Sequence, residues 1–295
     1  MKNSGATFVR AIQMILKPIK SIAGLYIDDM VVHSGNCHTY LRDIKRYLTT
    51  IRDSGVTLIL GKCELGKNSV KYDGHIVGSG RHEPDPEHIQ AVVEMQRPAS
   101  KKQIRQVFGT FGFFRSYIPD FSTIAKPLID LTWKNDPANV LWTEAHERAF
   151  NELKEQLCQA PCLSTPNMNK LWFLQCNASG VGVSACIGQY DSKGRERPVV
   201  YANQKLTPTQ RAWSIIGREA YAAIWALKRF ATWLFGAQIT VISDHNPSTY
   251  VVECAPKSVK LTRWALALQE FDLVFKYRRG TQHVIPNCLP RMGVT

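Results

Sequence analysis

Apolar residues recur along the chain with two different periods, and the changes of period divide it into segments. Over residues 6–20 and 39–53 they return every three or four positions, which is typical of amphipathic helices. Between these helices, two short apolar runs flank Asp28 and Asp29 in the stretch GLYIDDMVVHS. This pattern predicts a β-hairpin with both carboxylates in its turn. The apolar face of the second helix is predicted to contain Leu41, Ile44, Leu48 and Ile51.

The remaining segments follow the same two periods. Short strands are expected around residues 56–60 and 69–77, and the proline-rich, acidic stretch EPDPEHI indicates a boundary near residue 85. Two long amphipathic runs then predict helices across residues 86–168. From residue 169 onwards, the order three strands, helix, strand, helix, strand predicts an α/β layer. The chain is therefore expected to be an α+β multidomain protein.

Composition and charge add a class of partner. The chain has 295 residues, of which 44% are hydrophobic, and a formal net charge of +13. The net charge is +5 over residues 1–80, −1 over 81–168 and +9 over 169–295. Basic ends around a neutral middle favour a polyanionic partner such as nucleic acid, although a merely basic protein has the same balance.

The chain carries no sign of export or of a membrane span. Its first ten residues, MKNSGATFVR, lack the apolar core of a signal peptide, and no apolar run approaches the roughly 18–20 residues of a span. Its eight cysteines are scattered, so reduced thiols are expected. These features predict a soluble intracellular protein with no membrane partner.

The adjacent carboxylates Asp28 and Asp29 are the first candidate for chemistry. Like charges repel and ionised groups are costly to desolvate, so the pair requires either a solvated turn or a cation. Two aspartates at a hairpin tip can hold divalent ions that bind nucleotide phosphates during an in-line displacement. An ordinary Asx-type turn is the alternative.

The residues around this pair resemble a known family. The Tyr26-x-Asp28-Asp29 box between two apolar strands, preceded by the segment ATF, resembles the palm of a reverse transcriptase. The match continues in family order, and nearly the whole chain resembles Ty3/gypsy-type retrotransposon Pol polyproteins. The matching stretches are KCELGKNSVKYDGHIV for the primer-gripping hairpin, the segment from DPEHIQ to PLIDL for the thumb, and LWFLQCNASGVGVSACIGQ, REAYAAIWALKRF, ISDHNPSTYV and HVIPNCLPR for RNase H.

The resemblance implies a truncated reverse transcriptase palm over residues 1–85, a thumb and connection over 86–168, and an RNase H-like α/β domain with a mixed sheet over 169–292. The family's polymerase site uses a third aspartate upstream of a segment that resembles NSGATF, where this chain starts. Complete DNA synthesis is therefore not expected, and dNTP binding would require fingers from another Pol segment. Asp73 is a further departure, because the family usually has an apolar residue before that Gly-His.

The resemblance also implies a nuclease that hydrolyses RNA in RNA/DNA hybrids. Such a site holds two Mg²⁺ (or Mn²⁺) ions between four acidic residues. The corresponding positions here are Asn177, Glu219, Asp244 and Asn287. An amide oxygen can ligate Mg²⁺, but two of the four negative charges are lost, so weakened metal binding and severely impaired hydrolysis are expected.

Two of these four residues are conspicuous without the family. Glu219 shares a predicted helix face with the apolar Ile216, Ala223 and Leu227. A carboxylate there indicates a metal ligand, with a cap or a salt bridge as the alternative. Asp244 ends a predicted strand, where a ligand belongs in an open α/β sheet, although capping of the next segment competes with that role.

Several basic residues are candidates for contact with a template–primer. Lys101, Lys102 and Arg105 open the middle helix, where a thumb would meet phosphate, but a solvated helix face explains them equally well. The cations interleaved with aromatic residues near the C-terminus are Lys228, Arg229, Lys276, Arg278 and Arg279. They are expected to line a hybrid-binding groove, and core aromatics with snorkelling cations are the alternative.

The sequence thus predicts a retrotransposon-derived reverse transcriptase/RNase H fragment with impaired two-metal chemistry. The first alternative is a non-catalytic nucleic-acid-binding relic of a retroelement, and the second is a degraded gene product without function. Retained hybrid binding with a steep salt dependence would separate the first alternative from the second.

Overall fold

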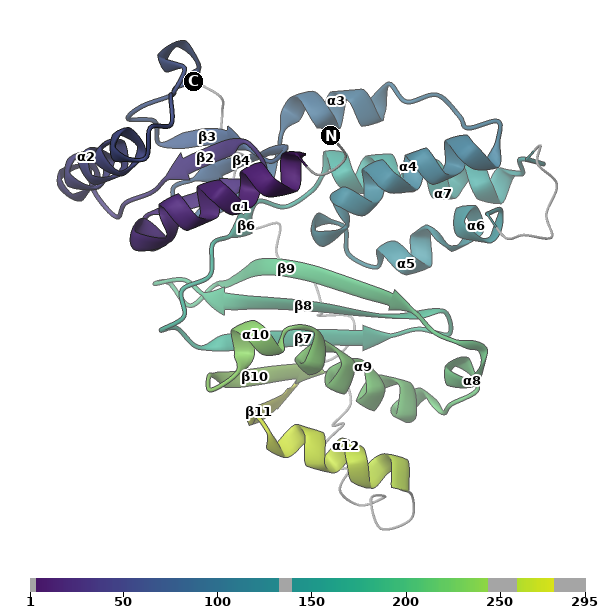
Figure 1. Ribbon diagram of the computed structural model, residues 1–295. Helices are drawn as coiled ribbons and strands as arrows, with labels where there is room; N and C mark the ends of the chain where they lie inside the picture. Colours follow the sequence, from purple (N-terminus) through teal and green to yellow (C-terminus); the bar gives the residue numbers. More distant parts are fainter. Residues whose placement is uncertain (1–3, 133–139, 244–258, 279–295) are drawn as a thin grey trace. The chain divides into compact units, whose positions relative to one another are not determined.

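The computed structural model describes residues 4–132, 140–243 and 259–278. The chain divides into two compact units, Met1–Ser79 and Gly80–Thr295. The architecture is α+β with a mixed sheet, as predicted (Figure 1). Within the described ranges, no helix combines the length and the apolar character that crossing a bilayer requires.

The first unit contains two long helices and two β-hairpins. Its elements are α1 (Ser4–Leu16), η1 (Lys17–Ile19), β1 (Ala23–Tyr26), β2 (Asp29–Val32), α2 (Cys37–Asp53), η2 (Leu60–Lys62), β3 (Ser69–Tyr72) and β4 (His75–Gly78). The first hairpin, β1–β2, confirms the hairpin predicted around the carboxylate pair. The strand expected at residues 56–60 is not formed, because Val56 and Leu58 pack against the core of the unit without joining a sheet.

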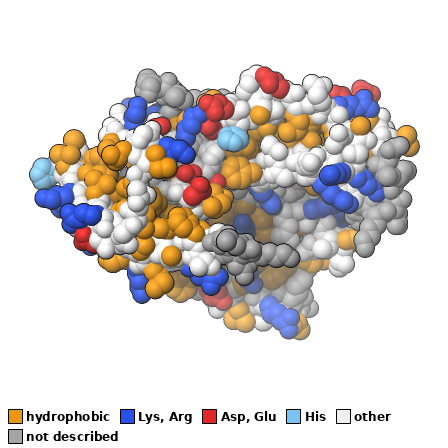
Figure 2. Space-filling model, turned by 45° about the horizontal axis from the view of Figure 1, so that its top comes forward, with side chains coloured by type: hydrophobic (Ala, Val, Ile, Leu, Met, Phe, Trp, Pro, Cys, Tyr) orange, Lys and Arg blue, Asp and Glu red, His pale blue; other side chains and the backbone are white. Residues whose placement is uncertain are grey.

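The buried face of α2 differs in part from the predicted one. Tyr47 and Ile51 are buried together with Asp43, so the buried stripe follows positions four residues apart. Hydrophobic side chains reach the molecular surface at several places (Figure 2). Leu41 and Leu48 are 63% and 42% exposed. Apolar periodicity was right for Ile51, which is buried, and for Ile44, which is partly buried and packs against the same core. It was wrong for Leu41 and Leu48, because Asp43 and Tyr47 occupy the rest of the buried face.

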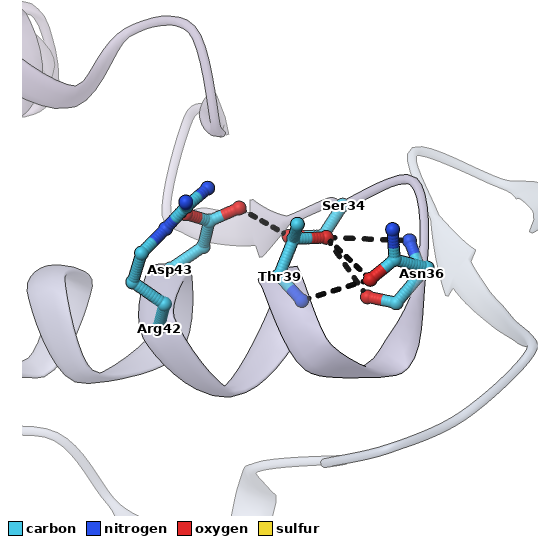
Figure 3. Close-up of polar contacts among 5 residues, drawn as sticks. All are labelled: Ser34, Asn36, Thr39, Arg42 and Asp43. Atoms are coloured by element: carbon cyan, nitrogen blue, oxygen red, sulfur yellow. Dashed lines mark hydrogen bonds and ion pairs between the residues drawn. The ribbon is translucent and has the colours of Figure 1, made fainter.

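The start of α2 is fixed by a reciprocal cap (Figure 3). The Asn36 side chain accepts a hydrogen bond from the backbone N–H of Thr39 at 2.9 Å, and the Asn36 backbone N–H donates to the Thr39 hydroxyl at 3.3 Å. Two otherwise unsatisfied groups of the first turn are thereby paired.

The same close-up shows why Asp43 tolerates its buried position (Figure 3). The Ser34 hydroxyl donates to Asp43 Oδ2 at 2.7 Å, and Arg42 Nε lies 3.3 Å from Oδ1. The hydrogen bond from Ser34 is the largest cause lowering the pKa of Asp43; Arg42 adds to it, and burial opposes it. The contact ties the end of the first hairpin to α2.

Ser34→Ala is expected to lower the melting temperature at pH 7, because the ionised Asp43 loses its main donor. The folded-state pKa of Asp43 is depressed, so this stabilisation is present above the unfolded pKa of about 3.9 and is lost as the pH falls through the folded-state pKa. Melting curves at pH 7 and pH 3 should therefore show a deficit that shrinks in acid. The same deficit in an Asp43→Asn background would contradict the coupling.

The second unit contains helices and a five-stranded sheet. Its elements are β5 (Arg81–Pro84), α3 (Pro86–Val93), α4 (Lys101–Phe113), η3 (Arg115–Tyr117), α5 (Phe121–Ile124), α6 (Lys126–Asp130), α7 (Glu144–Cys158), β6 (Leu163–Ser164), β7 (Trp172–Ala178), β8 (Gly182–Tyr190), β9 (Glu196–Lys205), α8 (Pro208–Arg211), α9 (Ile215–Arg229), α10 (Ala231–Leu234), β10 (Gln238–Ser243), α12 (Val259–Gln269) and β11 (Asp272–Tyr277). The two long helices predicted across residues 86–168 are confirmed in α4 and α7, and the first helix predicted after residue 169 is confirmed in α9.

The five-stranded sheet has the order β11-β10-β7-β8-β9. Strands β7, β8 and β9 are antiparallel neighbours, whereas β10 runs parallel to both β7 and β11. This mixed pattern matches the predicted order of strands and helices, because each parallel connection needs a crossover that α9 and α12 provide.

Each face of this sheet carries its own core. Trp172 and Leu174 of β7 pack with α9 on one face, as Figure 1 shows for the helix. Phe173, on the opposite face, packs in the core formed by Phe111, Leu153 and other residues of the middle helices. The helices of residues 86–158 therefore share a core with this face of the sheet, because successive side chains of β7 point to opposite faces.

Candidate functional site

The tip of the first hairpin exposes the carboxylate pair. Tyr26 pairs with Asp29 across the strands, so the turn itself consists of Ile27 and Asp28, and Asp29 begins β2. The prediction that both aspartates lie in the turn is therefore off by one residue. Both side chains are exposed, which removes the cost of desolvating two neighbouring charges.

The turn is strained at Ile27. Its φ of 51° lies in the left-handed region, which a β-branched residue rarely adopts and which turns of this length usually fill with glycine. Strain of this kind concentrates at functional sites, where the surrounding structure holds a side chain in a required position. The outlier favours a functional role for this hairpin tip over an ordinary turn.

A second hairpin, β3–β4, lies beside Tyr26. Its turn consists of Asp73 and Gly74 with φ of 47° and 67°, the pattern of a type I′ turn, in which Asp-Gly is preferred. The departure noted at Asp73 thus has a local backbone reason. The Asp73 carboxylate also accepts a hydrogen bond from the Tyr26 hydroxyl, which raises the pKa of Tyr26.

The hairpin tip fits a single hard cation better than a pair of ions. Carboxylate oxygens are ligands that Mg²⁺ prefers. Asp28 and Asp29 are exposed, so water molecules would supply the remaining ligands of the ion. Among the residues that the structure describes, however, no group of three or more His, Cys, Asp or Glu side chains is arranged to hold a metal ion.

Glu219 is buried at the end of β7. Its side chain lies on the face of α9 that packs on the sheet, where the residue is 5% exposed. Its Oε1 accepts a hydrogen bond from the backbone N–H of Ala178 at 3.0 Å. This contact ties α9 to the strand end and gives the carboxylate a structural role besides the predicted ligand role.

Asn177 precedes Ala178 on β7, but its side chain is exposed on the other face of the strand. It lines an open pocket of about 340 Å³ together with Asp120 and Glu152 from the middle helices. Because successive strand residues point to opposite faces, the structure does not bring the Asn177 side chain to the face on which α9 and Glu219 lie.

Asp244, Arg279 and Asn287, three of the predicted site residues, lie outside the described residues. The predicted group of four metal-holding positions is therefore seen only at Asn177 and Glu219.

The predicted nucleic-acid contacts differ in their surroundings. Lys102 and Arg105 are exposed on the first turns of α4, and Lys101 is partly exposed beside them. Lys228 and Arg229 are exposed in the last turn of α9, where positive charge complements the helix dipole.

Arg278 has an internal partner. Its Nη2 and Nη1 lie 2.5 and 3.0 Å from the two carboxylate oxygens of Glu196, which raises the pKa of Arg278. The fork-shaped pair neutralises the guanidinium within the protein. Its predicted role in binding nucleic acid would require breaking or sharing this ion pair.

A second pocket, of about 390 Å³, contains residues that the sequence did not single out. Arg115, Asn203 and Lys205 line it together with Arg229. Arg115 and Asn203 are 88 positions apart, and Arg115 Nη2 donates to the Asn203 backbone carbonyl at 2.7 Å. No periodicity or spacing links such distant residues, so only the fold reveals the pocket.

Two protein-family models match separate parts of the chain. Residues 1–77 match the family "Reverse transcriptase (RNA-dependent DNA polymerase)". Residues 142–241 match the "RNase H-like domain found in reverse transcriptase".

Curated relatives are retroelement polyproteins. The chain is 29% identical to the retrovirus-related Pol polyprotein from transposon opus and 30% identical to that from transposon 297, both of Drosophila melanogaster. These alignments cover 99% and 100% of this chain but 30% and 27% of the relatives. The Tf2-3 transposon polyprotein of Schizosaccharomyces pombe is 27% identical over 90% of this chain and 20% of its own length. The chain thus spans less than a third of these relatives.

Solved structures share the fold. The foamy viral protease-reverse transcriptase in complex with dsDNA matches 98% of this chain and 60% of its own with a TM-score of 0.81. The same viral protein in complex with an RNA/DNA hybrid matches 99% of this chain and 41% of its own with a TM-score of 0.78. Sequence identity is 22% in both cases, so the likeness describes the fold alone.

Proposed function

Because the chain carries reverse transcriptase and RNase H-like domains of the kind found in retrotransposon Pol polyproteins, we propose that it binds RNA/DNA hybrids and retains only impaired two-metal chemistry. The observation that carries this proposal is the exposed hairpin tip, in which a strained Ile27 presents Asp28 and Asp29 to solvent. A structural turn would gain nothing from that strain.

The two domains belong to families that generally use divalent metal ions. Asp28 and Asp29 would hold one such ion, Mg²⁺ or Mn²⁺, and when bound it would neutralise the negative charge of phosphate groups. Tyr26 would lie against the nucleic acid, with its hydroxyl oriented by Asp73. The exposed cations of α4 would contact the sugar–phosphate backbone of the nucleic acid. Such contacts position the protein on the duplex without reading the base sequence.

The impairment is proposed at the RNase H-like site. Asn177 supplies an amide where a carboxylate is expected, and its side chain lies on the face of β7 away from α9. Glu219 is engaged with the backbone of Ala178. The lost negative charge reduces the ability of the described residues to hold a metal pair.

A non-catalytic, nucleic-acid-binding role is the second candidate. It is favoured by the same Asn177 amide, because loss of charge at a metal site removes catalysis without altering the fold. The two candidates make the same prediction for binding and opposite predictions for residual hydrolysis.

One assay on the full chain separates the candidates. Fluorescence anisotropy with an end-labelled RNA/DNA hybrid should show binding that weakens steeply between about 50 and 200 mM salt. A steep dependence is expected because a protein that neutralises several phosphates releases their counterions on binding. The same samples, incubated with Mg²⁺ or Mn²⁺ and resolved by denaturing electrophoresis, report cleavage. Slow cleavage supports impaired chemistry, and none supports the non-catalytic role. Robust cleavage or absent binding would refute the proposal.

The ion at the hairpin tip can be tested by itself. The double variant Asp28→Asn/Asp29→Asn is expected to weaken Mn²⁺ binding by about tenfold or more, because two neutral amides replace two charged ligands. Isothermal titration calorimetry with Mn²⁺ measures the affinity of the wild-type chain and of the variant directly. Asp53→Asn is the matched control, since Asp53 is an exposed aspartate already paired with Arg52 at 3.0 Å. Unchanged Mn²⁺ affinity in the double variant would exclude the site.

A further inference from the structure

The second pocket of the Gly80–Thr295 unit lies at the end of the edge strand β9. Asn203 and Lys205 come from β9, Arg115 comes from η3, and Arg229 and Trp225 come from the last two turns of α9. The lining thus combines three cations with two aromatic rings, those of Phe121 and Trp225. Lys205 Nζ is balanced by Asp130 at 2.7 Å, which leaves the two guanidinium groups as the main charge.

Asn203 is the buried polar centre of this pocket. The residue is 3% exposed, and its Oδ1 accepts from the Ser122 hydroxyl at 2.7 Å and from Arg115 Nη2 at 3.3 Å. Since a guanidinium only donates, these contacts fix the orientation of the amide. The opposite atom, Nδ2, is buried without a hydrogen-bond partner in the part of the chain that the structure describes. A buried donor of this kind is costly unless something accepts from it.

Arg115 is arranged to share an anionic ligand. Both of its bonds to Asn203 use Nη2, so its Nε and Nη1 donors are not engaged by that residue. Arg115 and Arg229 line the same pocket, so the two cations lie within reach of each other's field. Burial, and after it the positive charge of Arg229, lowers the pKa of Arg115. Two like charges beside an unmatched N–H donor form a site that an anion would relieve.

We propose that this pocket binds one phosphate group of a nucleic-acid strand, held by Arg115, Asn203 Nδ2 and Arg229. Phosphate oxygens accept from guanidinium and amide donors together, and an aromatic wall such as Trp225 is common where a strand passes a basic groove. This inference rests on the proposed function, because it assigns part of hybrid binding to a particular site.

The test measures hybrid affinity against salt concentration for the full chain and two variants. Asn203→Asp keeps the oxygen that accepts from Ser122 and Arg115 but replaces Nδ2 by a negatively charged oxygen, so affinity should fall roughly tenfold or more. A melting curve of the same variant checks that it is folded at the assay temperature. Arg229→Gln should weaken binding and lower the salt slope by about one, the value for one lost phosphate contact.

The matched control is Lys193→Gln. It removes the same charge from an exposed lysine in the turn between β8 and β9, outside the lining of the pocket, and should leave the salt slope unchanged. Wild-type affinity and slope in both pocket variants would overturn the pocket proposal while leaving hybrid binding intact. Failure of the wild-type chain to bind the hybrid would overturn the proposed function and, with it, this assignment.

A second arm separates a strand phosphate from free phosphate. Inorganic phosphate is added at constant ionic strength, and the melting temperatures of wild type and Asn203→Asp are compared. No phosphate-specific shift, together with weaker hybrid binding by the variant, supports the strand. A shift in wild type alone, with hybrid binding unaffected by Asn203→Asp, would assign the pocket to free phosphate and refute the proposal.

Discussion

Restoring carboxylates in the double variant Asn177→Asp/Asn287→Asp is expected to raise Mg²⁺-dependent cleavage of RNA in a hybrid by more than about 100-fold. The physical reason is charge: a pair of divalent ions is held by anionic ligands, and two of four positions carry neutral amides. Asn177 is exposed and aspartate has the same shape, so the substitution should not disturb folding. Initial rates on a labelled hybrid, compared with the wild-type chain, measure the effect.

The control adds Glu219→Gln to the restored chain. Glutamine retains an oxygen that can accept from the Ala178 backbone N–H, so the fold is kept while one negative charge is lost. Cleavage should fall back towards the wild-type level. If the restored chain binds the hybrid but stays inactive, the position of residue 177 on the face away from α9, and not missing charge, limits the site, and the charge explanation is wrong.

The second large effect is expected at Gly188, where the register between β8 and β9 shifts. A Cβ atom added there would lie 2.2 Å from the Arg197 carbonyl oxygen and 2.3 Å from Phe173 Cζ. The backbone oxygen cannot move without breaking the ladder, and Phe173 is fully buried. Gly188→Ala should therefore lower the free energy of unfolding by about 3 kcal/mol or more, measured by urea denaturation.

Gly109→Ala is the matched control for this substitution. Gly109 lies in α4, is exposed, and has no neighbouring atom within 4 Å of an added Cβ. Because glycine is a poor helix former, this variant should gain about 0.5–1 kcal/mol. Equal stability of the two variants would show that the close approach at Gly188 is relieved by a shift of the strand.

Much of the local structure followed from the sequence. Apolar periodicity located the long helices α4, α7 and α9. The β1–β2 hairpin was predictable because short apolar runs flank two turn-forming aspartates. These features depend on residues within a few positions of one another, whose preferences act before any long-range contact forms.

Periodicity was incomplete where a polar residue took part in burial, and it failed where an apolar run found no strand partner. Asp43 occupies the buried face of α2 because Ser34, nine residues earlier, donates to it. Residues 56–60 alternate like a strand but join no sheet. The first outcome depends on a hydrogen-bond donor and the second on a neighbouring strand. The pattern of apolar residues within one segment says nothing about where either lies.

By itself, the sequence determined the order of elements, the carboxylate pair at Asp28 and Asp29, and the amide at Asn177, because motifs and periods are properties of neighbouring residues. Only the tertiary structure decided that Asn177 faces away from α9, that Glu196 neutralises Arg278, and that Arg115 meets Asn203 across 88 positions. Which side chains share a site depends on strand alternation and packing between distant segments, and these are settled when the two faces of the sheet are buried.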